Sequence, residues 1–212
     1  GKVHPCADCY LYLPRNGFLT EGVRGGTTAA QPRGGDTEKR HFTAQGGIAL
    51  QVVIQKLPET LPEFEQLAAE GRQPERICAL FLCALALFDR DKKAGAAAMN
   101  LLRGPKPLTP YDAQFLRDRL RGKPYLPLAY FEGATPENGY QPRTPYTLHV
   151  LADPRAQDME PGYLRVFLKT AGADSPRPMK LRQKASTGEW FLWEYSSILS
   201  GIRIPAAEDP WS

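Results

Sequence analysis

The longest apolar run of the chain is ICALFLCALALF, which covers residues 77–88 and ends at Asp89-Arg90-Asp91. Pro74 stands where a helix can begin, because the first helical turn does not need the amide proton that proline lacks. A helix that is apolar on every side is buried rather than amphipathic. The run is also shorter than the roughly 18 residues that span a bilayer. We therefore expect a central, buried helix and no membrane-spanning segment in this chain.

Further helices are predicted on both sides of this run. Thr60-Leu61-Pro62-Glu63 fits a capping box, in which the Thr60 hydroxyl and the Glu63 carboxylate each satisfy a free backbone amide at the start of a helix. A third helix is expected over about 91–103, because Gly104-Pro105 ends it. A fourth begins at Thr109-Pro110, and its expected inner residues are Tyr111, Phe115, Leu116 and Leu120. Residues 60–121 are thus predicted to form a helical cluster.

The sequence after Lys123 has a different character. Five prolines between residues 124 and 145 exclude a continuous helix, so residues 125–143 are predicted to be an irregular connector with exposed aromatics at Tyr130, Phe131 and Tyr140. Short runs of alternating apolar residues follow, and they predict strands near 146–150, 164–168, 179–181 and 190–193. A further strand is expected over Ile48 to Ile54. Strands without helices between them indicate an antiparallel sheet.

These patterns predict an α+β fold in which the central helical cluster packs against a C-terminal antiparallel β-sheet. Residues 42–212 are expected to form one domain, with its helical part at 60–121 and its β-rich part at 146–204. Residues 1–41 are expected to be an N-terminal extension with a flexible, glycine-rich loop at 25–35. The first residue is Gly1 rather than methionine, and a lone leading glycine is typical of what a cleaved purification tag leaves behind. On this interpretation a native N-terminal segment was removed, and a signal peptide or an anchor is one candidate for it. The compartment stays open on this evidence, with the cytoplasm slightly favoured.

The four cysteines fall into two pairs with different expected roles. Cys78 and Cys83 lie inside the apolar run and are expected to be small core residues. Cys6 and Cys9 form a single C-x-x-C motif, which could be half of a zinc site or a redox pair. No second C-x-x-C and no H-x-x-x-H is present to complete a zinc site. We therefore expect neither a metal nor a cofactor.

Catalytic motifs are also missing from the sequence. It contains no G-x-S-x-G, no H-E-x-x-H, no EF-hand loop and no phosphate-binding glycine motif. His149 lies on a predicted strand and is expected to be a partly buried structural histidine rather than a general base. His41 follows Lys39-Arg40 in a basic segment. We predict no catalytic residue.

The one local feature beyond the fold is a basic segment at 165–184. It holds six Lys and Arg residues and one Asp, whereas the whole chain carries only +4. Because strand side chains alternate, Lys180, Arg182 and Lys184 are expected on one sheet face, with Arg165 and Lys169 beside them. Cations next to an aromatic residue suit anionic sugars, phosphates or single-stranded nucleic acid. A solvated outer face is the structural alternative. The candidate ligand-binding residues are Arg165, Lys169, Arg177, Lys180, Arg182, Lys184 and Trp193.

Pro176-Arg177-Pro178 provides the basis for a second hypothesis. Two prolines hold the backbone around Arg177, so its guanidinium is presented at little entropic cost, and Asp174 is positioned to cap the loop or to pair with it. A rigid loop between strands explains the motif equally well. If the protein is an enzyme, we expect a hydrolase or transferase that acts on an anionic small molecule near Asp174 and Arg177, together with Tyr130 and Glu132.

Several stretches of the chain resemble a family of bacterial proteins, mostly clostridial, that is known only as a domain of unknown function. The resemblance covers about residues 42–212 and implies no activity, substrate or catalytic residue. It rests on residues 57–60 (LPET), 77–82 (ICALFL), 130–134 (YFEGA), 172–178 (GADSPRP), 181–184 (LRQK) and 209–211 (DPW). The sequence therefore favours a non-catalytic binding or interaction module whose partner is a protein or an anionic ligand, with the enzyme as the alternative.

Overall fold

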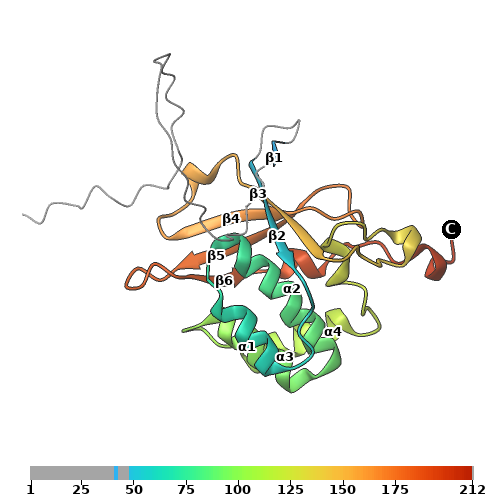
Figure 1. Cartoon of the computed structure of the whole chain (residues 1–212), viewed down its shortest axis with the longest axis horizontal. Coiled ribbons are helices and arrows are strands. Elements are labelled where there is room, and N and C mark those ends of the chain that lie inside the picture. The colour runs from blue at the N-terminus through green and yellow to red at the C-terminus, as the bar shows by residue number, and fades with distance from the viewer. Residues whose placement is uncertain (1–40, 43–47, 212) are drawn as a thin grey trace, which may run out of the picture. The chain divides into compact units, whose positions relative to one another are not determined.

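The computed structural model describes residues 41–42 and 48–211, all of which lie in the unit Thr37–Ser212. The predictions for Cys6, Cys9 and the glycine-rich stretch at 25–35 lie outside the described residues. The described residues form an α+β fold, as the sequence patterns predicted (Figure 1). None of their helices is long and apolar enough to cross a membrane.

The sheet has six antiparallel strands that are ordered as they occur in the chain, from β1 to β6. Their bounds are β1 His41–Phe42, β2 Ile48–Ile54, β3 Tyr146–Ala152, β4 Tyr163–Leu168, β5 Arg177–Gln183 and β6 Trp190–Glu194. A hairpin turn at 185–188 joins β5 to β6, and the Lys184 amide donates to the Glu189 carbonyl at 2.9 Å. The C-terminal strands were therefore located correctly from their alternation, with β5 beginning two residues earlier than expected.

Strand β2 joins this sheet although the whole helical cluster separates it from β3 in the chain. It runs antiparallel to β3, with Val52 opposite Leu148 and Ile54 opposite Tyr146. Val52 and Ile54 are buried. The sheet is therefore not confined to the C-terminal part, because its second strand comes from the N-terminal side of the helices.

Four helices lie on one side of the sheet (Figure 1). They are α1 Leu61–Ala69, α2 Pro74–Arg90, α3 Lys92–Arg103 and α4 Pro110–Leu120. Thr109 forms a complete capping box with Asp112 at the start of α4. At the start of α1 the box is incomplete, because the Glu63 carboxylate accepts from the Glu59 amide at 2.7 Å rather than from Thr60.

Helix α2 is the core of the fold, as its composition predicted. Within residues 77–88 only Ala86 is not fully buried. Cys78 and Cys83 are free, fully buried thiols, and burial raises the pKa of both. The helix contacts α1, α3, β2, β3 and β6, so it joins the helical layer to both halves of the sheet.

The prediction for Tyr111 was wrong. Its side chain is 79% exposed, whereas Leu116 and Leu120 of the same helix are buried. Leu116 lies five positions after Tyr111, which places the two side chains about 140° apart around the helix, so they cannot share one inner face.

The prediction of exposed aromatics in the connector was also wrong. Tyr130, Phe131 and Tyr140 are all buried. The Tyr130 hydroxyl donates to the Ile198 carbonyl at 2.7 Å, and the Tyr140 hydroxyl donates to the Arg203 carbonyl at 2.7 Å. Phe131 forms a β-bridge to Leu148. The connector is irregular because of its prolines, but its aromatic rings belong to the core. Two of these rings are hydrogen-bonded to the segment that follows β6.

Candidate functional site: a basic-aromatic sheet face

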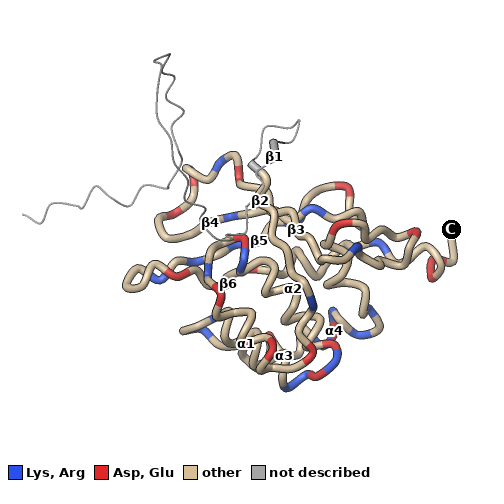
Figure 2. Tube along the Cα trace, viewed as in Figure 1, with Lys and Arg blue, Asp and Glu red and all other residues tan. Residues whose placement is uncertain are grey.

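The sheet has one face against the helices and one face that no described helix covers. On β4 and β5 the inner residues Val166, Leu168, Met179 and Leu181 are buried. The alternate residues of these strands point to the other side and are partly exposed. In Figure 2 the blue segments mark where Lys and Arg occur along β4 and β5. The strand register and alternation place Arg165, Lys180 and Arg182 among them on the outer side.

The strand register arranges the outer residues in rows. Tyr163 lies opposite Arg182 in one row, and Arg165 lies opposite Lys180 in the next. Lys180 is in turn opposite Glu194 on β6, where a bulge interrupts the pairing next to Trp193. We call the group of Lys106, Tyr163, Lys180, Arg182 and Trp193 the basic-aromatic face.

Arg182 is the centre of the basic-aromatic face. Its guanidinium carbon lies 4.7 Å from the centre of the Trp193 ring and 5.1 Å from that of the Tyr163 ring. The two rings meet edge to face, with their centres 5.7 Å apart. Cation–π contacts of this kind stabilise a cation by about 0.5–1 kcal/mol where it is exposed. The rings therefore hold an exposed guanidinium in place while leaving its charge available.

Two lysines complete the face from different elements. The Lys180 ammonium lies 4.9 Å from the Tyr163 ring and 3.6 Å from a Glu194 carboxylate oxygen. The Lys106 ammonium lies 4.3 Å from the Trp193 ring, although Lys106 belongs to the loop between α3 and α4. Buried Arg103 fixes this loop, because its Nε donates to the Lys106 carbonyl at 2.9 Å.

Arg165 lies beside the basic-aromatic face but is committed to an internal ion pair. Its Nε donates to Oδ2 of Asp153 at 2.7 Å, and the Asp153 side chain is only 2% exposed. Burial alone raises the pKa of a carboxyl group, but the Arg155 amide and the Arg165 guanidinium donate to Asp153 and hold its pKa below the ordinary value. Most of the Arg165 charge is therefore balanced within the protein.

The structure brings together only some of the predicted ligand-binding residues. Arg165, Lys180, Arg182 and Trp193 lie in adjoining positions on the outer side of the sheet. Lys169 and Lys184 each lie one residue beyond a strand end, are exposed, and form no ion pair or ring contact with another described residue.

Arg177 lies on the opposite side of the sheet. It has the same parity on β5 as buried Met179 and Leu181, and its Nη2 donates to the Gly201 carbonyl at 2.6 Å. Its Nε is buried without a hydrogen-bond partner among the described residues. Because β5 begins at Arg177, strand alternation places its side chain on the side of Met179 rather than on that of Lys180. The sequence alone did not show that the strand begins so early.

The residues of the alternative enzymatic site bind other groups. Asp174 pairs with Arg203 rather than with Arg177. The Tyr130 hydroxyl is held by a backbone carbonyl, and burial raises its pKa. Glu132 lies 3.1 Å from Nε2 of His149 on the outer side of β3. These side chains therefore do not converge on one reacting centre in the described residues.

His149 and Glu132 are a histidine–carboxylate pair near the surface. Both side chains are partly exposed, at 38% and 43%, and Arg143 lies 3.7 Å from the same carboxylate group. The nearby Thr147 hydroxyl donates to the Pro145 carbonyl, so it is not presented to the imidazole. The pair joins β3 to the connector.

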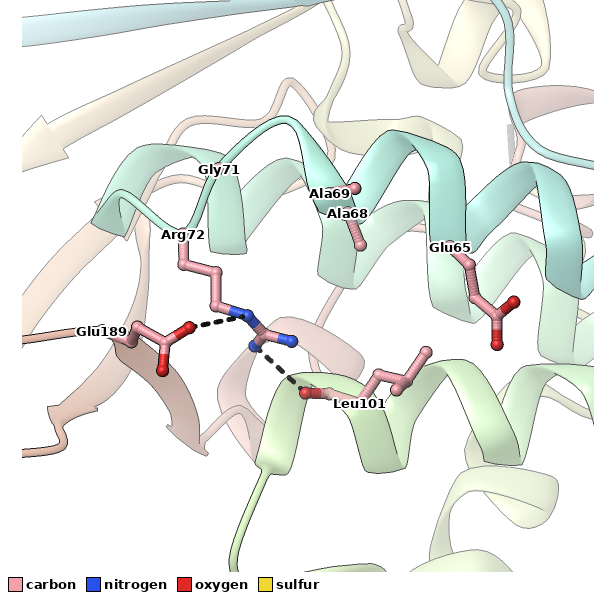
Figure 3. Close-up of a pocket in the computed structure, with 7 residues that line it drawn as sticks. All are labelled: Glu65, Ala68, Ala69, Gly71, Arg72, Leu101 and Glu189. Atoms are coloured by element: carbon pink, nitrogen blue, oxygen red, sulfur yellow. Dashed lines mark hydrogen bonds and ion pairs between the residues drawn. The ribbon is translucent and has the colours of Figure 1, made fainter. Parts of the chain in front are cut away.

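A shallow groove crosses the helical side of the molecule between α1 and α3 (Figure 3). Arg72 spans it, with Nη1 donating to the Leu101 carbonyl at 3.1 Å and Nε lying 3.7 Å from a Glu189 carboxylate oxygen. Ala68, Ala69 and Gly71 line one side of the groove. Besides Arg72 and Glu189, which pair with each other, the one charged residue that lines this groove is Glu65. The groove therefore holds no set of convergent catalytic groups.

Within residues 41–42 and 48–211, no three histidine, cysteine or carboxylate side chains are close enough to hold a metal ion. Sequence analysis missed two members of the basic-aromatic face. Tyr163 was missed because β4 begins one residue earlier than predicted. Lys106 was missed because it reaches Trp193 only through the tertiary packing of α3 against β6.

A family model described as a domain of unknown function (DUF6935) matches residues 56–206 of this chain. The chain belongs to this family. The DUF6935 match includes all four helices and strands β3 to β6, and it begins just after β2. It is therefore narrower than the range of 42–212 that the resemblance indicated. No curated protein matched the chain in sequence, and no solved structure matched it.

Proposed function

We propose that this DUF6935 domain is a non-catalytic binding module whose basic-aromatic face takes an anionic macromolecule. The observation that carries the proposal is the position of Arg182 between Tyr163 and Trp193, with Lys106 and Lys180 on the same two rings. Arg182 and Lys180 on the open sheet face, with Lys106 from the loop between α3 and α4, place three cations against one acidic neighbour, Glu194, and so leave a net positive charge. A flat surface of this kind suits an extended ligand better than a small molecule, which needs a concave site.

The candidate ligand-binding residues are expected to contribute differently to binding. Lys180, Arg182 and Trp193 belong to the binding surface itself. Arg165 supports the surface through its pair with Asp153, and exposed Lys169 and Lys184 add charge at its borders. Arg177 lies on the other side of the sheet and is not part of the proposed surface.

The test is the salt dependence of binding to heparin and to an oligothymidylate of about 15 nucleotides. Each neutralised phosphate or sulfate releases counterions, so both affinities should fall steeply between about 50 mM and about 200 mM salt. The triple variant K106Q/K180Q/R182Q should lose most of this binding and flatten the salt slope. Thermal unfolding should show that it stays folded, because exposed charges contribute little to stability.

A matched control removes the same charge from the helical side of the molecule. Lys93 and Arg121 are exposed and Lys123 is half-buried, and all three lie on or beside helices α3 and α4. The variant K93Q/R121Q/K123Q should therefore bind both polyanions nearly as well as the unchanged protein. Absence of binding to both polyanions at low salt would contradict the proposal, as would an equal loss in the two triple variants.

A further inference from the structure

We infer that the anionic partner is a single strand of nucleic acid, whose phosphates lie on the basic-aromatic face while its bases lie on a neighbouring apolar row. This inference rests on the proposed function and specifies its ligand. It is carried by the order of the outer residues on β3, β4 and β5.

The apolar row consists of Leu151, Phe167 and Pro178. Leu151 of β3 lies opposite Phe167 of β4, and Phe167 lies opposite Pro178 of β5. All three side chains are partly exposed on the side of the sheet that carries no described helix. The next row along the strands holds Arg165 and Lys180, so apolar and basic rows lie side by side.

The rings of the basic-aromatic face are already in contact with cations. Trp193 has Lys106 at 4.3 Å and Arg182 at 4.7 Å, and Tyr163 has Lys180 at 4.9 Å and Arg182 at 5.1 Å. A base that stacked on either ring would have to displace a cation that its own phosphate needs. These two rings therefore position charge rather than bind bases.

Phe167 is different from these two rings. Among the residues that the structure describes, its one cation contact is with Arg165 at 5.7 Å, and Arg165 is held by Asp153. Phe167 thus has fewer cation contacts than Tyr163 or Trp193, and it lies between two other apolar side chains. Stacking of a base on an aromatic ring tolerates any sequence, because every base has an apolar π face.

The ligand class follows from the combination of both rows. A sulfated polysaccharide or an inorganic polyphosphate supplies negative charge but has no flat apolar group for Phe167. Double-stranded nucleic acid keeps its base faces inside the helix. A single strand presents phosphates and unstacked bases together, which matches a basic row next to an apolar row.

The experiment compares three probes on the full chain: oligothymidylate, an oligomer of the same length that carries abasic sites, and heparin. Phe167→Ala should weaken oligothymidylate binding about tenfold, which corresponds to roughly 1.4 kcal/mol for one stacked base. Binding of the abasic oligomer and of heparin should stay within about twofold, because these probes use only the cations.

Two further variants make the comparison specific. Trp193→Leu should weaken all three probes alike, because it removes the support of Arg182 and Lys106. Phe167→Leu keeps an apolar side chain in the sheet and should still weaken oligothymidylate selectively, so the test remains valid if Phe167→Ala unfolds. Val53→Ala, which shortens another exposed apolar side chain on β2, is the matched control.

The outcomes separate this inference from the proposed function. If heparin binds and neither oligomer does, the nucleic-acid inference is wrong while the binding module stands. If Trp193→Leu weakens oligothymidylate more than the abasic oligomer, bases stack on Trp193 and the assignment to the apolar row is wrong. Equal binding of oligothymidylate and the abasic oligomer to the unchanged protein contradicts the inference as well. No binding to any probe at low salt contradicts both proposals.

Discussion

Asp153 shows how a single buried charge organises the outer side of the sheet. Its two carboxylate oxygens accept from the Arg155 amide at 3.0 Å and from the Arg165 guanidinium at 2.7 Å. A buried carboxylate is stable only when such donors replace the water it has lost. The pair therefore fixes the loop after β3 and holds the partly exposed Arg165 side chain in one position.

Asp153→Asn should destabilise the protein by about 1–3 kcal/mol near neutral pH, because the charge-assisted bond to Arg165 is lost. The folded-state pKa of Asp153 is lowered, so its stabilising effect is present above the unfolded pKa of about 3.9 and is lost as the pH falls through the folded pKa. Urea unfolding of both proteins near pH 7 and near pH 3 measures the difference in their free energies of unfolding. This difference should be smaller at the lower pH.

Asp158→Asn provides the control for this comparison, because Asp158 is exposed and lies in the same loop. It should change stability by less than about 0.5 kcal/mol at either pH. An Asp153→Asn variant as stable as this control near pH 7 would show that the pair with Arg165 is not structural.

At the level of elements, α2 carries the largest share of the core. Leu82 is fully buried, so Leu82→Ala should cost about 2–5 kcal/mol through lost burial and the cavity left behind. Leu101→Ala makes the same chemical change at a side chain that is 37% exposed on α3. Denaturant unfolding should show a much smaller loss for Leu101→Ala, and equal losses would mean that α2 is not the centre of the core.

The two helix caps differ in quality, and this difference is measurable. The Thr109 hydroxyl accepts from the Asp112 amide at 3.1 Å and donates to Oδ2 of Asp112 at 2.8 Å. At α1 the corresponding bond from the Glu63 amide to Thr60 is longer, at 3.4 Å. Thr109→Ala should therefore cost about 1 kcal/mol, and Thr60→Ala less. Thermal unfolding of the two variants measures which one loses more stability. A larger loss for Thr60→Ala would contradict the prediction.

At the scale of the whole molecule, the family match and the fold have different boundaries. The DUF6935 match begins at residue 56, whereas β2 ends at Ile54 and contributes buried Val52 and Ile54 to the core. A chain that began at residue 56 would also leave one edge of β3 without its partner β2, while the other edge would still pair with β4.

We therefore expect a version that begins at residue 56 to be less stable than one that begins at residue 41. The loss should be about 3–6 kcal/mol, since burial of each of two large apolar side chains contributes about 1.5–3 kcal/mol. Thermal unfolding of the two versions measures it. Equal stability would show that β2 is an accessory strand.

The sequence by itself determined the elements and the fold class. The period of the apolar residues identified α2 as buried, the proline and threonine pattern placed the starts of α1 and α4, and strict alternation placed β3 to β6. These signals are local, because a helix or strand that buries one side must repeat its apolar residues with its own period. The alternation of Lys180 and Arg182 with Met179 and Leu181 also indicated the basic row, although nothing in it identified a ligand.

Only the tertiary structure decided which elements meet. The pairing of β2 with β3, the burial of Tyr130 and Tyr140, and the reach of Lys106 to Trp193 all join residues that are far apart in the chain. Such contacts depend on how complete elements pack, and no short sequence pattern records them. Arg177 was expected in a loop between strands, whereas it is the first residue of β5 and shares the inner side with Met179 and Leu181.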